Sequence, residues 1–196
     1  MKKFEETKFT IPALKGISAK TIEEHLKLYA GYVKHANLIL EHIDELAKDA
    51  EKYAYELGEI HRRFSFEFNG MRNHEYYFKS FEGGAKALSP KSKLGEMLAQ
   101  EWGSFDGWLA RFKSIALTRG IGWAMLYYDK QTERLLTAWV DEQHLGQLSM
   151  CAVVLALDMW EHSYVADYQP SGKKKYTENF FENLNWEVIE KNFSDA

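Results

Sequence analysis

The period of the hydrophobic pattern changes at Gly120-Ile121-Gly122, and this change restricts the fold more than any other feature of the chain. From about Ser18 to Phe81 the sequence has few glycines and no proline, and between Thr21 and His42 apolar residues recur every three or four positions. That spacing is typical of one face of a helix. After the glycines, short apolar runs alternate with turn-forming residues, as in strands. The chain is therefore expected to have an α+β fold, with a helical N-terminal half and a small sheet after it.

The N-terminal half is expected to form a helical hairpin, built from three helical segments. The first begins near Ser18 or Thr21, since Ser18 can cap a helix and Thr21 can open a capping box that closes on Glu24. The second is expected at about Asp44–Leu57. The third carries Asn73-His74 and ends near position 80.

A turn-rich stretch from Gly83 to Lys91 separates the two halves and predicts two domains, residues 1–84 and 90–196. Ser89 is the expected N-cap of the next helix, with Pro90 in its first turn. The second half is expected to form a three-stranded antiparallel sheet packed with helices, and its third strand is expected to be fully buried. The expected helices are Lys91–Gln100, Phe105–Thr118 and one or two within Thr177–Asn192, and the expected strands are Trp123–Tyr128, Leu135–Val140 and Cys151–Leu157.

Composition excludes several classes of protein. Hydrophobic residues make up 45% of the 196 residues, which is enough for a substantial core. The formal charge of −4 argues against a nucleic-acid binder. A single cysteine, Cys151, excludes an intrachain disulfide framework and is expected to be a buried structural thiol. No apolar stretch follows Met1-Lys2-Lys3 or is long enough to cross a bilayer, so the cytoplasm is the expected location, without membrane contact.

Asp158 and His162 form the most informative pair, because a carboxylate and an imidazole four residues apart can chelate a metal if the chain turns there. Oxygen and nitrogen donors suit borderline first-row metals. Trp160 is expected to shield such a site from water, and Glu161 to orient an imidazole. Alone the pair is a weak signal, since a solvated aspartate and a hydrogen-bonded histidine are commoner.

The stretch DMWEHSY, from Asp158 to Tyr164, resembles the DxWEHxY signature of the iron/manganese superoxide dismutases. Further similarities follow in the order found in that family and cover nearly the whole chain, from about Ile17 to Phe193. They lie at Phe68-Asn69-Gly70, Asn73-His74, Trp102-Gly103-Ser104-Phe105-Asp106, Gly120-Ile121-Gly122-Trp123 and Asn185-Trp186-Glu187-Val188.

The resemblance implies that one Mn or Fe ion per chain is held by His25, His74, Asp158 and His162. The first of these ligands needs a choice, because the interval before Tyr32 is one residue shorter here than in the family. Alignment from upstream gives His25 as the ligand, whereas alignment from Tyr32 gives Glu24. Positions i and i+7 of a regular helix share a face, which favours His25.

The resemblance also implies roles for residues around the metal. Tyr32 would gate the substrate channel, and Gln143 would hydrogen-bond solvent at the metal, although His144 is an alternative. Gly70 lies where iron enzymes often have a glutamine, so the combination with Gln143 slightly favours manganese. The expected catalytic residues are Tyr32, Trp123, Gln143, Trp160 and Glu161.

The implied activity is the disproportionation of superoxide to dioxygen and hydrogen peroxide, with the metal alternating between M(III) and M(II). Superoxide is an anion, so a chain of charge −4 needs a local positive region near the site. Lys173 or Lys174 lies near the family's channel-mouth arginine. Two alternatives remain: a metal-binding relative with reduced or altered redox activity, and a non-catalytic interaction module.

The implied partner is a second copy of the chain. In the family, a glutamate at the position of Glu161 reaches the last histidine ligand of the other subunit, here His162. A histidine–tyrosine pair that accompanies it is replaced by Leu28 or Tyr29 on one side and by Val165 on the other. We therefore expect a homodimer that keeps the Glu161–His162 bridge and substitutes other contacts for the lost pair.

Overall fold

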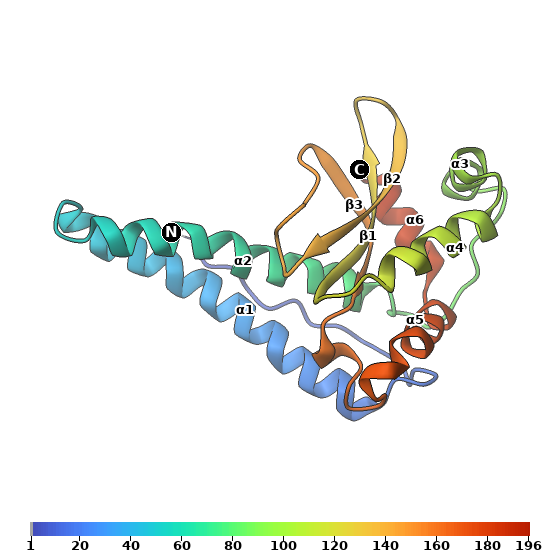
Figure 1. The fold of residues 1–196 in the computed structure, drawn as a ribbon, viewed down its shortest axis with the longest axis horizontal. Helices are drawn as coiled ribbons and strands as arrows, with labels where there is room; N and C mark the ends of the chain where they lie inside the picture. Colours follow the sequence, from blue (N-terminus) through green and yellow to red (C-terminus); the bar gives the residue numbers. More distant parts are fainter. Residues whose placement is uncertain (1) are drawn as a thin grey trace.

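The computed structural model describes residues 2–196. It confirms the α+β class, with a hairpin of two long helices followed by a three-stranded antiparallel sheet packed with helices (Figure 1). The helices are α1 (Ala19–Leu46), α2 (Ala54–Lys79), α3 (Lys93–Trp102), α4 (Phe105–Ala116), α5 (Lys173–Glu182) and α6 (Trp186–Ser194), with 3-10 turns η1 (Ala47–Asp49), η2 (Glu161–Ser163) and η3 (Pro170–Gly172). The strands are β1 (Gly122–Asp129), β2 (Arg134–Asp141) and β3 (Cys151–Asp158).

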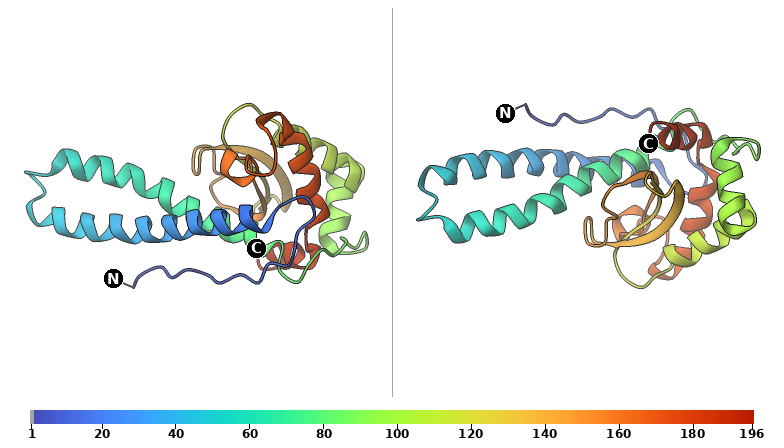
Figure 2. Two further views of the ribbon diagram at one scale, coloured as in Figure 1. Left: turned by 90° about the horizontal axis from the view of Figure 1, so that it is seen from below. Right: turned by 90° about the horizontal axis from the view of Figure 1, so that it is seen from above.

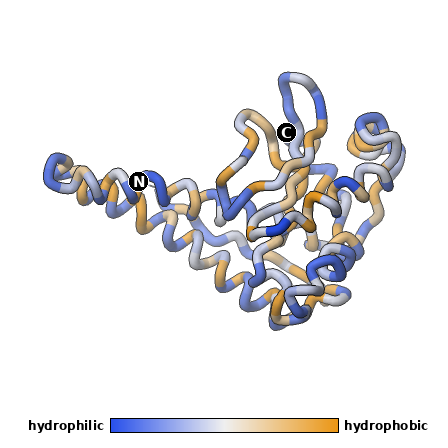
Figure 3. Tube along the Cα trace, in the orientation of Figure 1, coloured by the Kyte–Doolittle hydropathy of each residue, from blue (hydrophilic) through white to orange (hydrophobic). Residues whose placement is uncertain are grey.

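Helices α1 and α2 lie side by side and project from the rest of the molecule (Figure 2). The expectation of three helical segments was wrong, because α1 continues to Leu46 and α2 is one helix from Ala54. The chain reverses at 47–53, where the run Lys48–Lys52 lacks the large apolar side chains that two packed helices need. Hydrophobic and hydrophilic residues alternate along both helices, as in amphipathic helices with one side in water (Figure 3).

Ser18 is the N-cap of α1, and its hydroxyl accepts a hydrogen bond from the Thr21 backbone N–H at 3.1 Å. The prediction that Ser89 caps the next helix was wrong. Ser92 is the cap of α3 and accepts from the Gly95 N–H at 3.2 Å. The Ser89 carbonyl instead closes a turn by accepting from the Ser92 N–H at 3.1 Å, so Pro90 lies in that turn and not in the helix.

The sheet has the order β2-β1-β3, with β1 in the centre. The register pairs Trp123 on β1 with Asp158, the last residue of β3. Gly122 begins β1 with a φ of +156°, and a Cβ there would lie 2.1 Å from the Val140 carbonyl oxygen, so only glycine fits. Gly122 therefore lets β1 approach β2 closely, and its carbonyl accepts a hydrogen bond from the Met159 N–H, just after β3, at 2.9 Å.

The third strand is buried only in part, contrary to expectation. Its first three residues are half-buried and the stretch Val154–Asp158 is fully buried. Cys151 begins the strand and is also half-buried, so the expectation of a buried thiol was wrong.

A single cluster of buried hydrophobic residues joins the N-terminal helices, the sheet and the C-terminal helices. Aromatic rings dominate it. Tyr77 of α2 stacks on Phe180 of α5 with ring centroids 5.7 Å apart. Among residues 2–196, no helix combines the length and the apolar character that a membrane span requires.

Candidate metal centre

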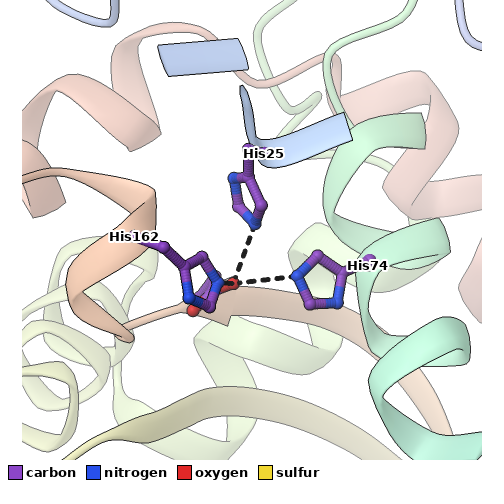
Figure 4. Close-up of side chains that lie close together, drawn as sticks. His25, His74 and His162 are labelled. Carbon is purple, nitrogen blue, oxygen red and sulfur yellow. Dashed lines mark hydrogen bonds and ion pairs between the residues drawn. The ribbon is translucent and has the colours of Figure 1, made fainter. Parts of the chain in front are cut away.

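Four side chains from four different elements meet between the hairpin and the sheet. His25 comes from α1, His74 from α2, Asp158 from the end of β3 and His162 from η2. One donor atom from each lies within 4.8 Å of all the others. The Nε2 atoms of His25 and His162 both lie 3.0 Å from Asp158 Oδ2, and that of His74 lies 3.4 Å away. Figure 4 shows the three imidazole rings directed at one another.

The register of α1 determines which of two neighbouring residues enters this cluster. His25 is buried, and its ring packs at 5.0 Å from Tyr77. Glu24 is exposed and pairs with Lys27 at 2.9 Å. Tyr32, seven positions after His25, is also buried, as the i, i+7 spacing predicts for a regular helix.

His74 is oriented by its own helix. Its Nδ1 lies 2.6 Å from the Gly70 carbonyl oxygen, so Nδ1–H donates to that carbonyl and the lone pair is on Nε2. This Nε2 atom is fully buried and has no hydrogen-bond partner. Buried polar atoms without a partner are rare and costly, and a metal ion satisfies such a nitrogen directly. The donor set thus fits a metal.

Electrostatics hold the donors in their ligating forms. Burial lowers the pKa of His74 to about 3, and nearby His25 adds to this effect. Burial also lowers the pKa of His25. For Asp158, burial acts to raise the pKa, but the adjacent His162 and His25 outweigh it and keep the pKa well below its usual range. Two neutral buried imidazoles and a carboxylate are a donor set for borderline first-row metals.

A hydrogen-bonded chain lies beside the cluster. Gln143 is fully buried, and its Nε2 donates to the Tyr32 hydroxyl at 2.8 Å. The Trp123 indole N–H donates to Gln143 Oε1, also at 2.8 Å. Asn73, next to His74, donates to the Gln143 carbonyl at 2.9 Å. The sequence-predicted residues Tyr32, Gln143 and Trp123 therefore lie together.

Trp160 and Glu161 differ in their surroundings. The Trp160 indole donates to the Glu142 carbonyl at 3.0 Å, and its ring stacks on that of His162 with centroids 5.7 Å apart. Trp160 therefore covers one side of the metal-binding group. Glu161 is exposed, although it adjoins His162 in sequence.

Two residues that the sequence did not single out also shape the site. Tyr176 of α5 donates from its hydroxyl to the Asp158 carbonyl at 3.0 Å, and nothing in its local sequence indicates this contact. Phe66 packs on Tyr32 with ring centroids 6.0 Å apart. Phe66 lies eight residues before His74, so the helical spacing along α2 could have indicated it.

Comparison with known proteins agrees with this geometry. Residues 90–192 match the family described as iron/manganese superoxide dismutases, C-terminal domain. The chain is 30% identical over 186 residues to the iron superoxide dismutase of Pyrobaculum aerophilum, covering 92% of this chain and 85% of that protein. It is 33% identical over 186 residues to the iron superoxide dismutase of Cupriavidus metallidurans, covering 93% and 91%.

The manganese superoxide dismutase of Mycolicibacterium fortuitum is 31% identical over 175 residues, with 88% of this chain and 82% of that protein covered. A fold of helical hairpin and small sheet around a largely buried His-His-Asp-His group defines a class of single-metal proteins. The chain belongs to the iron/manganese superoxide dismutase family.

Proposed function

We propose that this protein is a superoxide dismutase that uses one Mn or Fe ion per chain. The observation that carries the proposal is the group of three imidazoles and one carboxylate, buried except for the partly exposed His162, in a chain of this family. His25, His74, Asp158 and His162 would hold the ion. Two superoxide ions and two protons would yield one dioxygen and one hydrogen peroxide.

A bound Mn or Fe ion would supply the one-electron chemistry by alternating between its trivalent and divalent states. The chain's own residues would supply protons and exclude bulk water. Burial, with Asp158 and Glu67 nearby, raises the pKa of Tyr32, so its hydroxyl keeps its proton at neutral pH. Tyr32 Oη accepts from Gln143 Nε2, which leaves the hydroxyl proton free to be donated into the site.

Two observations bear on the metal and on the solvent-binding donor. The ring of Tyr32 occupies the space beside Gly70, where a side chain would lie 2.5 Å from it, so a glutamine at this position is excluded. Gln143 faces Tyr32, whereas the ring of His144 packs against Phe66 with centroids 5.7 Å apart. These contacts support Gln143 as the donor and, slightly, manganese. The named relatives include both iron and manganese enzymes.

We further propose a homodimer in the cytoplasm, with domains 1–84 and 90–196 each supplying two metal ligands. Glu161 is exposed beside His162, so its carboxylate is free to reach a second copy. Leu28 and Val165, which replace the family's polar pair, are exposed apolar residues that a partner would cover.

The proposal is tested by loading the purified protein with Mn or Fe and measuring superoxide disproportionation together with metal content. We expect His74→Ala and Asp158→Ala to lower both, and activity to fall by more than about 100-fold because a ligand matters more than its outer partners. Glu24→Ala is the control, since this residue is exposed next to a ligand. If the wild-type protein binds its metal but removes superoxide no faster than buffer alone, the proposal is wrong. The protein would then be a metal-binding member of the family without this activity.

A further inference from the structure

One face of α2 leads outward from the metal-binding group to a cation. Along this face, His74, Gly70, Phe66 and Arg63 follow at intervals of three or four residues, so they lie on one side of the helix. The Arg63 guanidinium carbon lies 3.7 Å from the centre of the Phe66 ring, which is a close cation–π contact. The other neighbours of Phe66 are the rings of Tyr32, His144 and Trp160, at 6.0, 5.7 and 6.4 Å.

Phe66 and Tyr32 differ in exposure from the residues deeper in the site. Both keep a little exposure, 8% and 9% respectively, whereas His74 and Trp123 keep none. The Phe66 ring contacts Arg63 on one side and Tyr32 on another. Arg63 lies against that ring and has 55% of its side chain exposed.

A buried carboxylate holds Arg63 in this position. Arg63 donates from Nε at 2.9 Å, and its Nη2 lies 2.8 Å from the same oxygen, Oε1 of Glu67. The Glu67 side chain is only 6% exposed, and His35 Nδ1 lies 3.9 Å from its other oxygen. An anion that approaches from solvent therefore meets the guanidinium first, with its counter-charge behind it.

Of the two lysines expected near the channel mouth, Lys173 and Lys174, the first is hydrogen-bonded within the chain. Lys173 donates from Nζ to the carbonyls of Thr118 and Gly120, at 2.8 and 3.3 Å. The same ammonium lies 5.2 Å from the ring centre of Trp139. Lys173 and Arg63 thus both have partners within the chain, but Arg63 lies against a ring that itself contacts Tyr32, beside the metal-binding group.

We propose that Arg63 is the residue that attracts small anions to the metal site, and that Glu67 is the positioning residue that keeps its guanidinium over Phe66. The identity of the anion as superoxide rests on the proposed function. The class of ligand, a small monovalent anion, rests only on the charge and geometry of this face.

The kinetic test compares kcat/KM of the metal-loaded variants as ionic strength is raised. We expect Arg63→Gln to lower kcat/KM about two- to five-fold at low salt and to flatten its decline with salt, because steering by exposed charges is screened beyond about 10 Å at 0.1 M. Arg63→Lys keeps the charge and should restore the slope. The double variant R63Q/E67Q leaves no buried unpaired carboxylate, so it tests the charge even if Arg63→Gln folds poorly.

The control is Arg62→Gln, which makes the same charge change at the adjacent, exposed residue that pairs only with Glu59. An equal loss in Arg62→Gln would overturn the proposal, since net charge alone would then account for it. A slope unchanged in both Arg63→Gln and R63Q/E67Q would overturn it as well.

Azide binding to the metal-loaded protein, followed by its optical spectrum, separates this inference from the proposed function. The probe is a small monovalent anion and requires no turnover. We expect Arg63→Gln to weaken azide binding about two- to five-fold at low salt and not at high salt. If the wild type fails to disproportionate superoxide yet shows this effect, the function is wrong and the anion-attracting role stands. Equal azide affinity in wild type and Arg63→Gln would refute that role.

Discussion

The Asp158 carboxylate makes its polar contacts inside the protein. Its carboxylate is fully buried, with Oδ1 accepting from the Trp160 N–H at 2.8 Å and Oδ2 facing three imidazoles. A buried carboxylate is costly unless it is paired and hydrogen-bonded. In the metal-free protein, adding a proton to a buried imidazole is unfavourable. The free energy of unfolding is therefore expected to depend on pH.

We predict that acid destabilises the metal-free protein well before most surface groups titrate. The pKa of His74 is about 3 in the folded chain and 6.5 in its reference state, so between these values the unfolded chain binds more protons. The free energy of unfolding must then fall as pH falls, by about 1.4 kcal/mol per pH unit for each such proton. The depressed pKa of Asp158 acts in the same direction at lower pH.

The measurement is denaturant unfolding of the metal-free protein at several pH values from 7 to about 4. His74→Gln should reduce the dependence on pH, because the titrating ring is gone. His61→Gln, at an exposed position of the same helix, is the matched control. Identical pH dependence in His74→Gln and wild type would contradict the prediction.

At the scale of an element, helix α2 contributes both to the hydrophobic core and to the metal-binding group. It carries His74, the carbonyl of Gly70 that orients it, and Phe66 one turn further on. Gly70 is needed because the Tyr32 ring lies against the helix there, with two ring carbons 2.5 and 2.7 Å from where a Cβ would be. A second glycine of the same helix, Gly58, has nothing within 4 Å of that point.

We predict opposite effects for alanine at these two glycines. Gly70→Ala should destabilise the protein by about 1–3 kcal/mol, since the rigid Tyr32 ring must move, and should lower activity by disturbing the hydrogen bond to Gln143. Gly58→Ala should be neutral or stabilising by up to about 1 kcal/mol, because alanine favours a helix. Denaturant unfolding of both variants decides this; a change of the same sign in both would show that contact with Tyr32 is not the cause.

At the scale of the whole molecule, the metal-binding group joins parts that are far apart in the chain. His25 and Asp158 are 133 residues apart, yet their side chains meet. The exposed neighbours of the site, Glu161 with Leu28 and Val165, form the surface proposed for the second copy. The α1–α2 hairpin extends away from the rest of the molecule (Figure 2).

We predict that the protein is a dimer in solution and that Glu161→Ala shifts it toward the monomer. Loss of the carboxylate removes two bridges at once, because a two-fold axis repeats the contact. Light scattering over a range of concentrations measures the shift. Glu59→Ala, at an exposed position on the hairpin, should not change the mass. A wild type that stays monomeric at all concentrations would refute the prediction.

Local patterns in the sequence were sufficient for the fold class and for most elements. The three- to four-residue spacing of α1, the hairpin of β1 and β2 and the pair of C-terminal helices depend on neighbours along the chain. Among the elements, the predictions that were wrong concern helix ends, which depend on contacts between residues farther apart in the chain. The turn at 47–53 depends on where two packed helices run out of apolar side chains, and the cap at Ser92 depends on a turn around Pro90.

For the site, the sequence by itself indicated His25, His74, Asp158 and His162 through their resemblance to family motifs. Such motifs can be found in a sequence because the metal ligands in them must be imidazoles or carboxylates. Only the tertiary structure brought the four side chains within 4.8 Å of one another, whereas the exposed position of Glu24 follows from the helix face that the sequence already favoured. It also decided the contacts that have no local pattern, such as Tyr176 with the Asp158 carbonyl and Arg63 with Phe66. Covalent neighbours determine which face a side chain takes, but distance between segments is determined by packing, which no local pattern encodes.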